Sequence, residues 1–469
     1  MRDRGFRIRV RVPAVIMERV MPDLTESSPW LDRSVKCIAY LGVILIGFDA
    51  SPYGPAPMAI GTSLLLAGLP LLYWRGLSIR FKDPLIILAI LLASWVLLRG
   101  VADLLFPFMD PAHYNAESFW YHFRASGAMA LLVGLWIYAV PGSALCGIGA
   151  MMAGMFVHPW HMQFWTELAA ALSGQYRLNM NMNPHVIGKY TGIMFLIGVL
   201  FFAYGVYFGI KRICKRASWA LILSSLYLIP LYLLLFITTK SCLGWIAGVV
   251  TLAVLIILMV HKFYSFESAN KRNTIYWVSG IALAIVLMSL PFANTVTNLF
   301  IQDHHSLKAA ATFQFDEVQD ESIAMRMMFW QAAVKDISEY PLRGWGPGFV
   351  NHVSMLSENE KISATNTHNT YIQFAVSMGL FWTAIWIAFH ALLIARAAKA
   401  TNRLTRNAFI AEIGLTISIF FLVSGLAQFV LHNSNGFSVY LFGTSLLVGI
   451  ALMNYRENTL CSSSSTKQS

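Results

Sequence analysis

The stretch SCLGWIAGVVTLAVLIILMVH, from Ser241 to His261, contains no Asp, Glu, Lys or Arg. It is as long as the roughly 20 residues that a helix needs to cross a hydrocarbon core of about 30 Å. Similar apolar blocks recur from Val35 to Met453, and the chain of 469 residues is 57% hydrophobic and only 12% charged. Soluble chains carry about 25% charged residues. The composition therefore predicts an all-α polytopic membrane protein.

About 12 transmembrane helices are expected from these blocks. The stretch Ala125–Val157 is interpreted as two spans hinged at Pro141-Gly142, with one span and a re-entrant piece as the alternative. The predicted spans are Val35–Phe48, Pro57–Tyr73, Pro84–Leu98, Ala125–Val140, Gly142–Val157, Val186–Ile210, Trp219–Ile237, Ser241–His261, Ile275–Pro291, Thr370–Ile394, Phe409–Leu431 and Phe437–Met453.

Loop charge gives the orientation. Basic residues occur at the N-terminus and in almost every second loop, whereas the opposite loops Asp49–Ala56 and His432–Gly436 contain no Lys or Arg. Because Lys and Arg are enriched in cytoplasmic loops, both termini are expected inside, and the net charge of +11 requires no nucleic-acid partner. The expected organisation is a cytoplasmic segment 1–34, a membrane domain 35–291, a periplasmic loop 292–368, a second membrane part 369–455 and a cytoplasmic tail 456–469.

The cysteines and histidines do not predict a metal centre. The five cysteines are scattered, with no Cys-x-x-Cys pair, and His304-His305 has no third ligand nearby in the sequence. Disulfide frameworks and zinc sites need closer groupings. Neither is expected, and the outer loops contain no Asp-x-Asp motif for a divalent cation.

The long loop 292–368 contains the most informative pattern. Apolar residues recur at helical spacing over Glu321–Tyr340 and predict an amphipathic helix that ends before Pro341. A glycine-rich turn, Arg343-Gly-Trp-Gly-Pro-Gly348, follows it. The loop then ends with His368-Asn369 directly before an apolar span, so the histidine is expected at the membrane–water boundary on the outer face.

The combination of Arg326-x-x-x-Trp330, Pro341, Gly344-Trp-Gly346 and His368-Asn369 at the edge of a span resembles the O-antigen ligase and O-antigen polymerase superfamily, and is closest to the ligases. The resemblance implies a glycosyltransferase in the bacterial inner membrane, with a large periplasmic loop that contains short helices. It implies transfer of a glycan from undecaprenyl diphosphate to lipid A-core on the periplasmic side, without cofactor or metal. Polymerases and protein O-oligosaccharyltransferases, which use the same donor, remain alternatives.

The residues agree with that chemistry. Cleavage of a glycosyl–diphosphate bond leaves negative charge that cations can stabilise, and a histidine can accept the proton of the acceptor hydroxyl. By motif, Arg326 and His368 match the catalytic residues of the family, and Lys240 occupies the place of a second arginine, where the planar guanidinium fork is lost. The candidate substrate-binding residues are Asn369, Arg343, Trp330, Lys189, His185, Arg124 and Arg177, for the last two of which headgroup or solvent contact is the simpler interpretation.

Two functions from other classes were weighed against this one. A transporter or flippase would be expected to show charges in the middle of spans, discontinuous helices and internal repeats. Almost no charge lies at mid-span here, and no repeat relates the two halves. A non-catalytic scaffold would leave the pattern from Arg326 to His368 without explanation.

Overall fold

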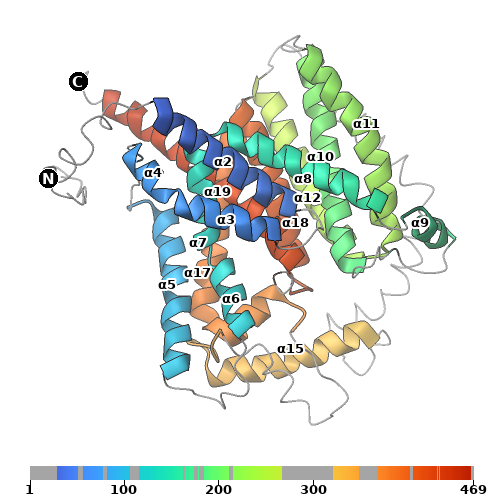
Figure 1. The fold of residues 1–469 in the computed structure, drawn as a ribbon. Helices are drawn as coiled ribbons and strands as arrows, with labels where there is room; N and C mark the ends of the chain where they lie inside the picture. Colours follow the sequence, from blue (N-terminus) through green and yellow to red (C-terminus); the bar gives the residue numbers. More distant parts are fainter. Residues whose placement is uncertain are drawn as a thin grey trace, which may run out of the picture.

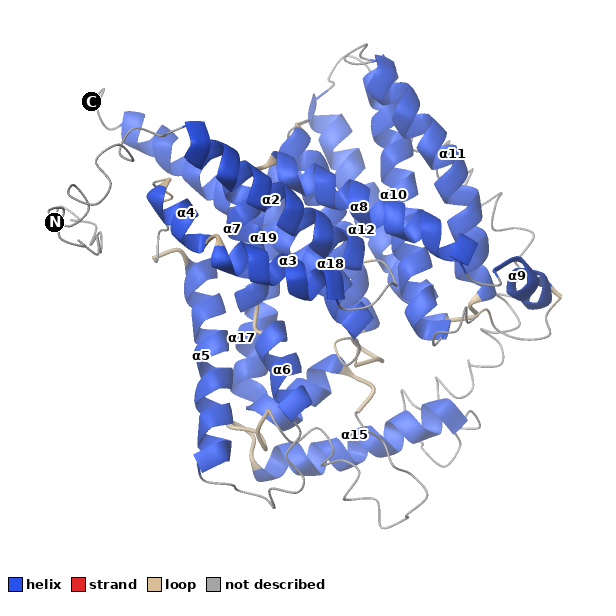
Figure 2. Cartoon of the chain, in the orientation of Figure 1, coloured by secondary structure: helices blue, strands red, loops and turns tan. Residues whose placement is uncertain are grey.

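The computed structural model shows a bundle of helices, and the part of the chain that it describes contains no strand (Figures 1 and 2). Five predictions lie outside the described residues: the span Ile275–Pro291, most of the loop 292–368, both ends of the chain, Arg177 and the side chain of His185. The structure describes residues 29–50, 56–75, 77, 82–105, 116–161, 164–173, 178, 184–210, 215–266, 321–347, 367–401, 405–429, 431 and 434–465.

The helices follow the predicted apolar blocks closely. Their bounds are α2 Pro29–Asp49, α3 Ala56–Ala67, α4 Leu69–Trp74, α5 Pro84–Leu105, α6 Ala116–Ala125, α7 Ala128–Ala139, α8 Gly142–His161, α9 Phe164–Leu172, α10 Pro184–Ile210, α11 Lys215–Thr238, α12 Cys242–Phe266, α15 Glu321–Glu339, α17 Thr370–Thr401, α18 Arg406–Ser424 and α19 Ser434–Ser465.

By length and composition, 7 helices of the described chain could cross a membrane. They are Pro84–Leu105, Val186–Gly209, Lys215–Thr238, Gly244–Lys262, Thr370–Thr401, Arg406–Ser424 and Gly436–Asn454, and each coincides with a predicted span. The structure therefore confirms the all-helical membrane class but not the full predicted count.

Some predicted spans are divided or shortened. The single block Pro57–Tyr73 forms two helices, α3 and α4, because a proline in the first turn of α4 cannot donate a backbone hydrogen bond. The Ala125–Val157 stretch forms α7 and α8 on either side of Val140 and Pro141, but neither helix is among the 7 that could cross a membrane, so the prediction of two spans is not confirmed. The span predicted to reach Leu431 ends at Ser424, where the chain turns at Gly425.

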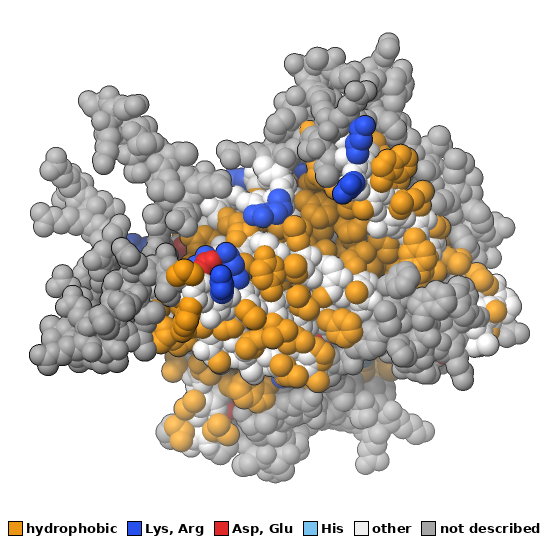
Figure 3. All heavy atoms as spheres, turned by 45° about the horizontal axis from the view of Figure 1, so that its top comes forward, with side chains coloured by type: hydrophobic (Ala, Val, Ile, Leu, Met, Phe, Trp, Pro, Cys, Tyr) orange, Lys and Arg blue, Asp and Glu red, His pale blue; other side chains and the backbone are white. Residues whose placement is uncertain are grey.

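The surface of the bundle is apolar along its sides. Leu98, Val101 and Leu105 on α5 are more than half exposed, as are Leu223 on α11 and Val249 on α12. Figure 3 shows hydrophobic side chains over most of the described surface in view, with Lys and Arg in a few small groups. Such a surface is expected of helices that face lipid.

Buried tryptophans link helices of the interior by hydrogen bonds. Trp136, Trp382 and Trp386 are almost fully buried, and each indole N–H donates a hydrogen bond to a backbone carbonyl of another helical segment: those of Leu65, Leu92 and Ala125. Because a buried indole N–H without an acceptor is costly, these bonds fix which helices lie beside one another.

Two ends of the bundle can be distinguished. At one end, Asp32 in the first turn of α2 pairs with Arg75 after α4 (2.6 Å), and Asp83 before α5 pairs with Arg396 late in α17 (2.7 Å). We call this the Arg396 end. At the opposite end, α15 lies across the bundle below α5, α6 and α17 (Figure 1), and we call this the α15 end.

Candidate functional site

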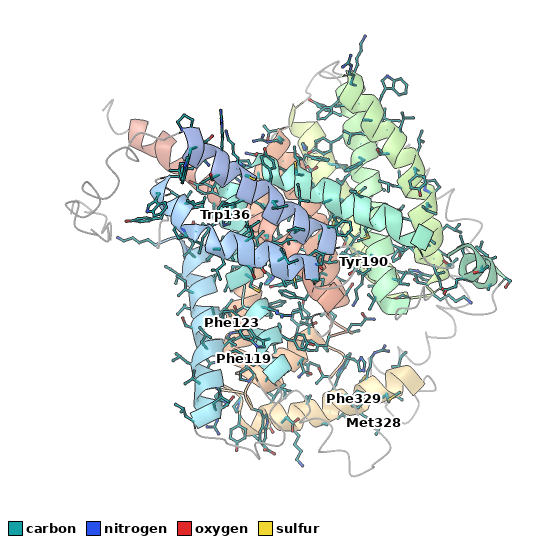
Figure 4. The ribbon with its side chains drawn as sticks, in the orientation of Figure 1. Phe119, Phe123, Trp136, Tyr190, Met328 and Phe329 are labelled. Carbon is teal, nitrogen blue, oxygen red and sulfur yellow. The ribbon has the colours of Figure 1, made fainter. Side chains whose placement is uncertain are left out.

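Helix α15 presents one face to the bundle. Phe329 and Ala333 on this face are 6% and 0% exposed, whereas Met328 on the outer side is 49% exposed (Figure 4). Arg326 lies three residues before Phe329 and four before Trp330, and residues at these spacings are neighbours on a helix surface. Arg326 is therefore on the inner face of α15.

This face contacts the segment that precedes α17. The indole N–H of Trp330 donates to the carbonyl of Thr367 (3.0 Å), and the Phe329 ring stacks on the His368 ring with centroids 5.9 Å apart. Arg326 lies one turn before both aromatic residues, so the face of α15 that contains Arg326 is the face that contacts His368 and Thr367.

His368 has an unusual backbone conformation. Its φ is 51°, in the left-handed region that residues other than glycine rarely adopt. The residues on either side are both anchored. Asn369 accepts from the N–H groups of Tyr371 and Ile372 and so caps the start of α17, and its amide N–H donates to Leu426 O (2.6 Å). The side chain of Asn369 is thus used in these capping contacts, and its role in substrate binding stays a prediction.

The glycine-rich turn docks on a break in α17. Gly379 has φ 84° inside this helix, which leaves neighbouring backbone groups without helical partners. The N–H groups of Trp345 and Gly346 donate to the carbonyls of Val376 (2.9 Å) and Ser377 (2.8 Å). In return, the N–H of Leu380 donates to Pro341 O (2.7 Å). The turn thus completes the hydrogen bonding that the break removes.

The glycines of this turn are required because there is no room for a side chain at their positions. A Cβ at Gly344 or Gly379 would overlap backbone atoms of the opposite segment, and one at Gly346 would overlap the carboxylate of Asp103 on α5. Gly344 and Gly346 also have positive φ angles of 63° and 117°. The sequence pattern Gly344-Trp-Gly346 is therefore explained by the close approach of this turn to the backbone of α17 and to Asp103.

Arg343 lies apart from this pair. It follows the C-terminal end of α15, and from Arg326 to the end of that helix the chain rises about 20 Å. Its guanidinium lies over the Tyr340 ring at 4.3 Å and near Asp103, which also pairs with Arg99 (3.2 Å). The structure does not bring Arg343 together with His368.

Lys240 and Lys189 come from neighbouring helix ends. Lys240 lies in the turn between α11 and α12 and has φ 48°. Gly188 packs against Thr239 and Ser241, the two residues that flank Lys240, so Lys189 is next to this turn. Lys189 is only 9% exposed. Within the described part of the chain, neither lysine has a carboxylate partner.

Arg124 ends α6 and lies over the ring of Phe437, at 5.6 Å from its centroid. On the same helix, His122 is fully buried and its Nδ1 is 2.8 Å from the carbonyl of Ser118. Burial lowers the pKa of His122 to about 4, so this ring is neutral at physiological pH. His122 was not predicted from the sequence, because nothing in its neighbours distinguishes it.

Asp336 was also not predicted as a special residue. It lies on the inner face of α15 and is 1% exposed. Burial, with a smaller contribution from Glu339, raises the pKa of its carboxyl to about 7. Its backbone carbonyl accepts from the indole N–H of Trp345 (3.1 Å), which links α15 to the glycine-rich turn.

No group of three or more His, Cys, Asp or Glu that could hold a metal ion occurs in the described ranges.

The comparisons with known proteins give one family match, over part of the chain. A search of curated proteins finds no match to the chain. Residues 227–387 match the family model described as O-antigen ligase. The matched region begins in α11 and ends in α17, and so includes Lys240, Arg326, the glycine-rich turn, His368 and the break at Gly379. This part of the chain is similar to the O-antigen ligases, and the match supports the O-antigen ligase superfamily that the sequence motif indicated.

Proposed function

We propose that this protein is a membrane glycosyltransferase that transfers a glycan from undecaprenyl diphosphate to lipid A-core on the periplasmic side of the bacterial inner membrane. The observation that carries the proposal is the docking of α15 on the segment before α17. It brings the face with Arg326 against His368, two residues that are 42 positions apart in the sequence. A cation and a titratable base in one place are what the reaction needs.

The reaction follows from these groups. The acceptor hydroxyl attacks the anomeric carbon of the donor sugar, the bond from this carbon to the diphosphate oxygen breaks, and undecaprenyl diphosphate leaves with the electron pair. His368 accepts the hydroxyl proton as general base. Arg326 and Lys240 stabilise the negative charge that develops on the diphosphate. Lys189 lies next to Lys240 and adds a further cation on the donor side.

The proposed reaction needs no metal, because side-chain cations take its place. Purified protein with a lipid-linked donor should keep its activity in EDTA. Loss of activity on chelation, with recovery in magnesium or manganese, would contradict this part of the proposal.

The acceptor is tested by deletion of the gene and electrophoresis of the lipopolysaccharide. The proposal expects polymer to disappear from lipid A-core while lipid-linked polymer accumulates. A core that carries a single repeat unit would indicate an O-antigen polymerase instead, and loss of glycan from proteins alone would indicate an O-oligosaccharyltransferase. Lipid-linked polymer trapped on the cytoplasmic side would indicate a transporter.

A further inference from the structure

The position of His368 depends on the residue before it. Thr367 is fully buried, and all three of its polar groups are bonded. Its carbonyl accepts from Trp330 Nε1 (3.0 Å), its hydroxyl donates to Asn369 O (3.0 Å), and its N–H donates to Oε1 of Gln373 (3.0 Å). A left-handed residue persists only where its surroundings determine its conformation, and these three bonds do so for His368.

Of the three partners of Thr367, Gln373 is the residue that the sequence motif does not include. It is 0% exposed and lies one turn into α17, in an otherwise apolar stretch. Its amide nitrogen donates to the hydroxyl of Ser377 (3.3 Å), which turns the amide oxygen toward Thr367. A buried amide in a span is costly unless it is bonded, and polar residues in such places are commonly functional.

We propose that Gln373 is a positioning residue for His368: its side-chain oxygen holds the N–H of Thr367 and thereby keeps the histidine in the left-handed conformation in which its ring stacks on Phe329. Gln373 does not contact the reacting atoms in this account. The inference rests on the proposed function, because it requires that His368 takes part in the transfer.

The test removes the acceptor oxygen while the fold is kept. Gln373→Leu should lower kcat by about 10- to 100-fold, because a small misplacement of a reacting group can cost about 100-fold. KM for an undecaprenyl-diphosphate-linked glycan should stay unchanged, since donor binding depends on the cations. Gln373→Glu retains an oxygen toward Thr367 and should restore most of the turnover. The matched control Gln331→Leu, on the exposed side of α15, should have no effect.

A double-variant cycle separates positioning from a general effect on packing. In a His368→Ala background, Gln373→Leu should cause no further loss, because the residue on which it acts is absent. An equal loss in both backgrounds would overturn the proposal, as would full activity of Gln373→Leu. If Gln373→Leu does not fold, Gln373→Asn replaces it in the same cycle, since its shorter amide stays buried but withdraws from Thr367.

The two proposals fail in different ways. Wild-type turnover in His368→Ala alone would contradict the proposed function, whatever Gln373 does. Low turnover in His368→Ala together with full turnover in Gln373→Leu would contradict only the positioning role.

Discussion

Two cations at the Arg396 end and two lysines near the α15 end differ in their partners. At the Arg396 end, Arg396 pairs with Asp83, and Lys262 pairs with Glu412 (2.9 Å) while also donating to the hydroxyl of Tyr204 (2.6 Å). At the α15 end, Lys189 and Lys240 have no carboxylate partner in the described ranges, although Lys189 is buried. A buried cation without a counterion destabilises a fold. The first set of cations holds helices together, and under the proposed function the two lysines serve the diphosphate of the donor.

The largest effects on turnover are expected for Arg326→Ala and His368→Ala. Loss of a single group that stabilises developing charge costs up to about 10³-fold, so transfer should become barely detectable while the protein level is unchanged. The measurement is glycan transfer by purified protein. Lys335→Ala, an exposed change on the opposite side of α15, is the control and should be active. Full activity of Arg326→Ala would contradict the proposed role of this arginine in stabilising the charge on the diphosphate.

His368→Ala is the second of these variants. A general base contributes typically 10²–10⁴-fold, and turnover should fall within that range while the lipid-linked donor still binds. His368→Gln distinguishes two roles, because glutamine forms hydrogen bonds but does not accept a proton at neutral pH. Turnover near that of the wild type in His368→Gln would make the histidine a positioning group and not a base.

At Lys240, the charge of the side chain should affect kcat/KM more than its shape does. Reversal of the charge in Lys240→Glu removes a charge-assisted contact worth about 1.5–3 kcal/mol, so kcat/KM should fall by about 10- to 100-fold. Lys240→Arg keeps the charge and should retain activity. Equal activity in the Glu and Arg variants would show that this lysine does not contact the donor.

At the Arg396 end, the expected effect is on stability and not on turnover. Glu412→Ala leaves Lys262 buried without its partner, and such losses cost about 3–5 kcal/mol. The thermal midpoint in detergent should fall, while kcat per folded molecule stays the same. The paired change of Lys262→Met with Glu412→Leu should recover most of the stability. A loss of kcat in folded Glu412→Ala would show that the two ends are coupled.

The smallest expected effect is a pH dependence at α15. The pKa of Asp336 is about 7 in the folded protein, above the ordinary value of 3.8, because its carboxyl is buried. The folded state then binds more protons than the unfolded state, so stability should fall as pH rises from about 4 to about 7. Asp336→Asn should flatten this part of a plot of thermal midpoint against pH. An unchanged slope would assign the dependence to other groups.

Much of the architecture follows from composition and periodicity alone. The uncharged block that begins at Ser241 forms α12, and the apolar repeat from Glu321 forms α15, because burial of an apolar face dominates both. The division of Pro57–Tyr73 was not predicted, since the sequence remains apolar on both sides of the break and only Pro70 interrupts its backbone bonding.

The site was predicted in part, for a physical reason. Arg326 and His368 belong to a motif, and their types identify the chemistry. Phe329 and Gln373 have no such signature, because each acts by packing or hydrogen bonding to one partner that is distant in the sequence. Arg343 was grouped with these residues by its glycine neighbours, but its neighbours serve the break in α17.

The break at Gly379 has a consequence for how the chain is made. In lipid, the carbonyls of Val376 and Ser377 would be costly to leave unbonded, and they accept from the N–H groups of Trp345 and Gly346. The glycine-rich turn precedes α17 in the chain, so it leaves the ribosome first. The partner for the broken helix is thus already present when α17 emerges, and a circular permutation that reversed this order would release α17 before its partner had been synthesised.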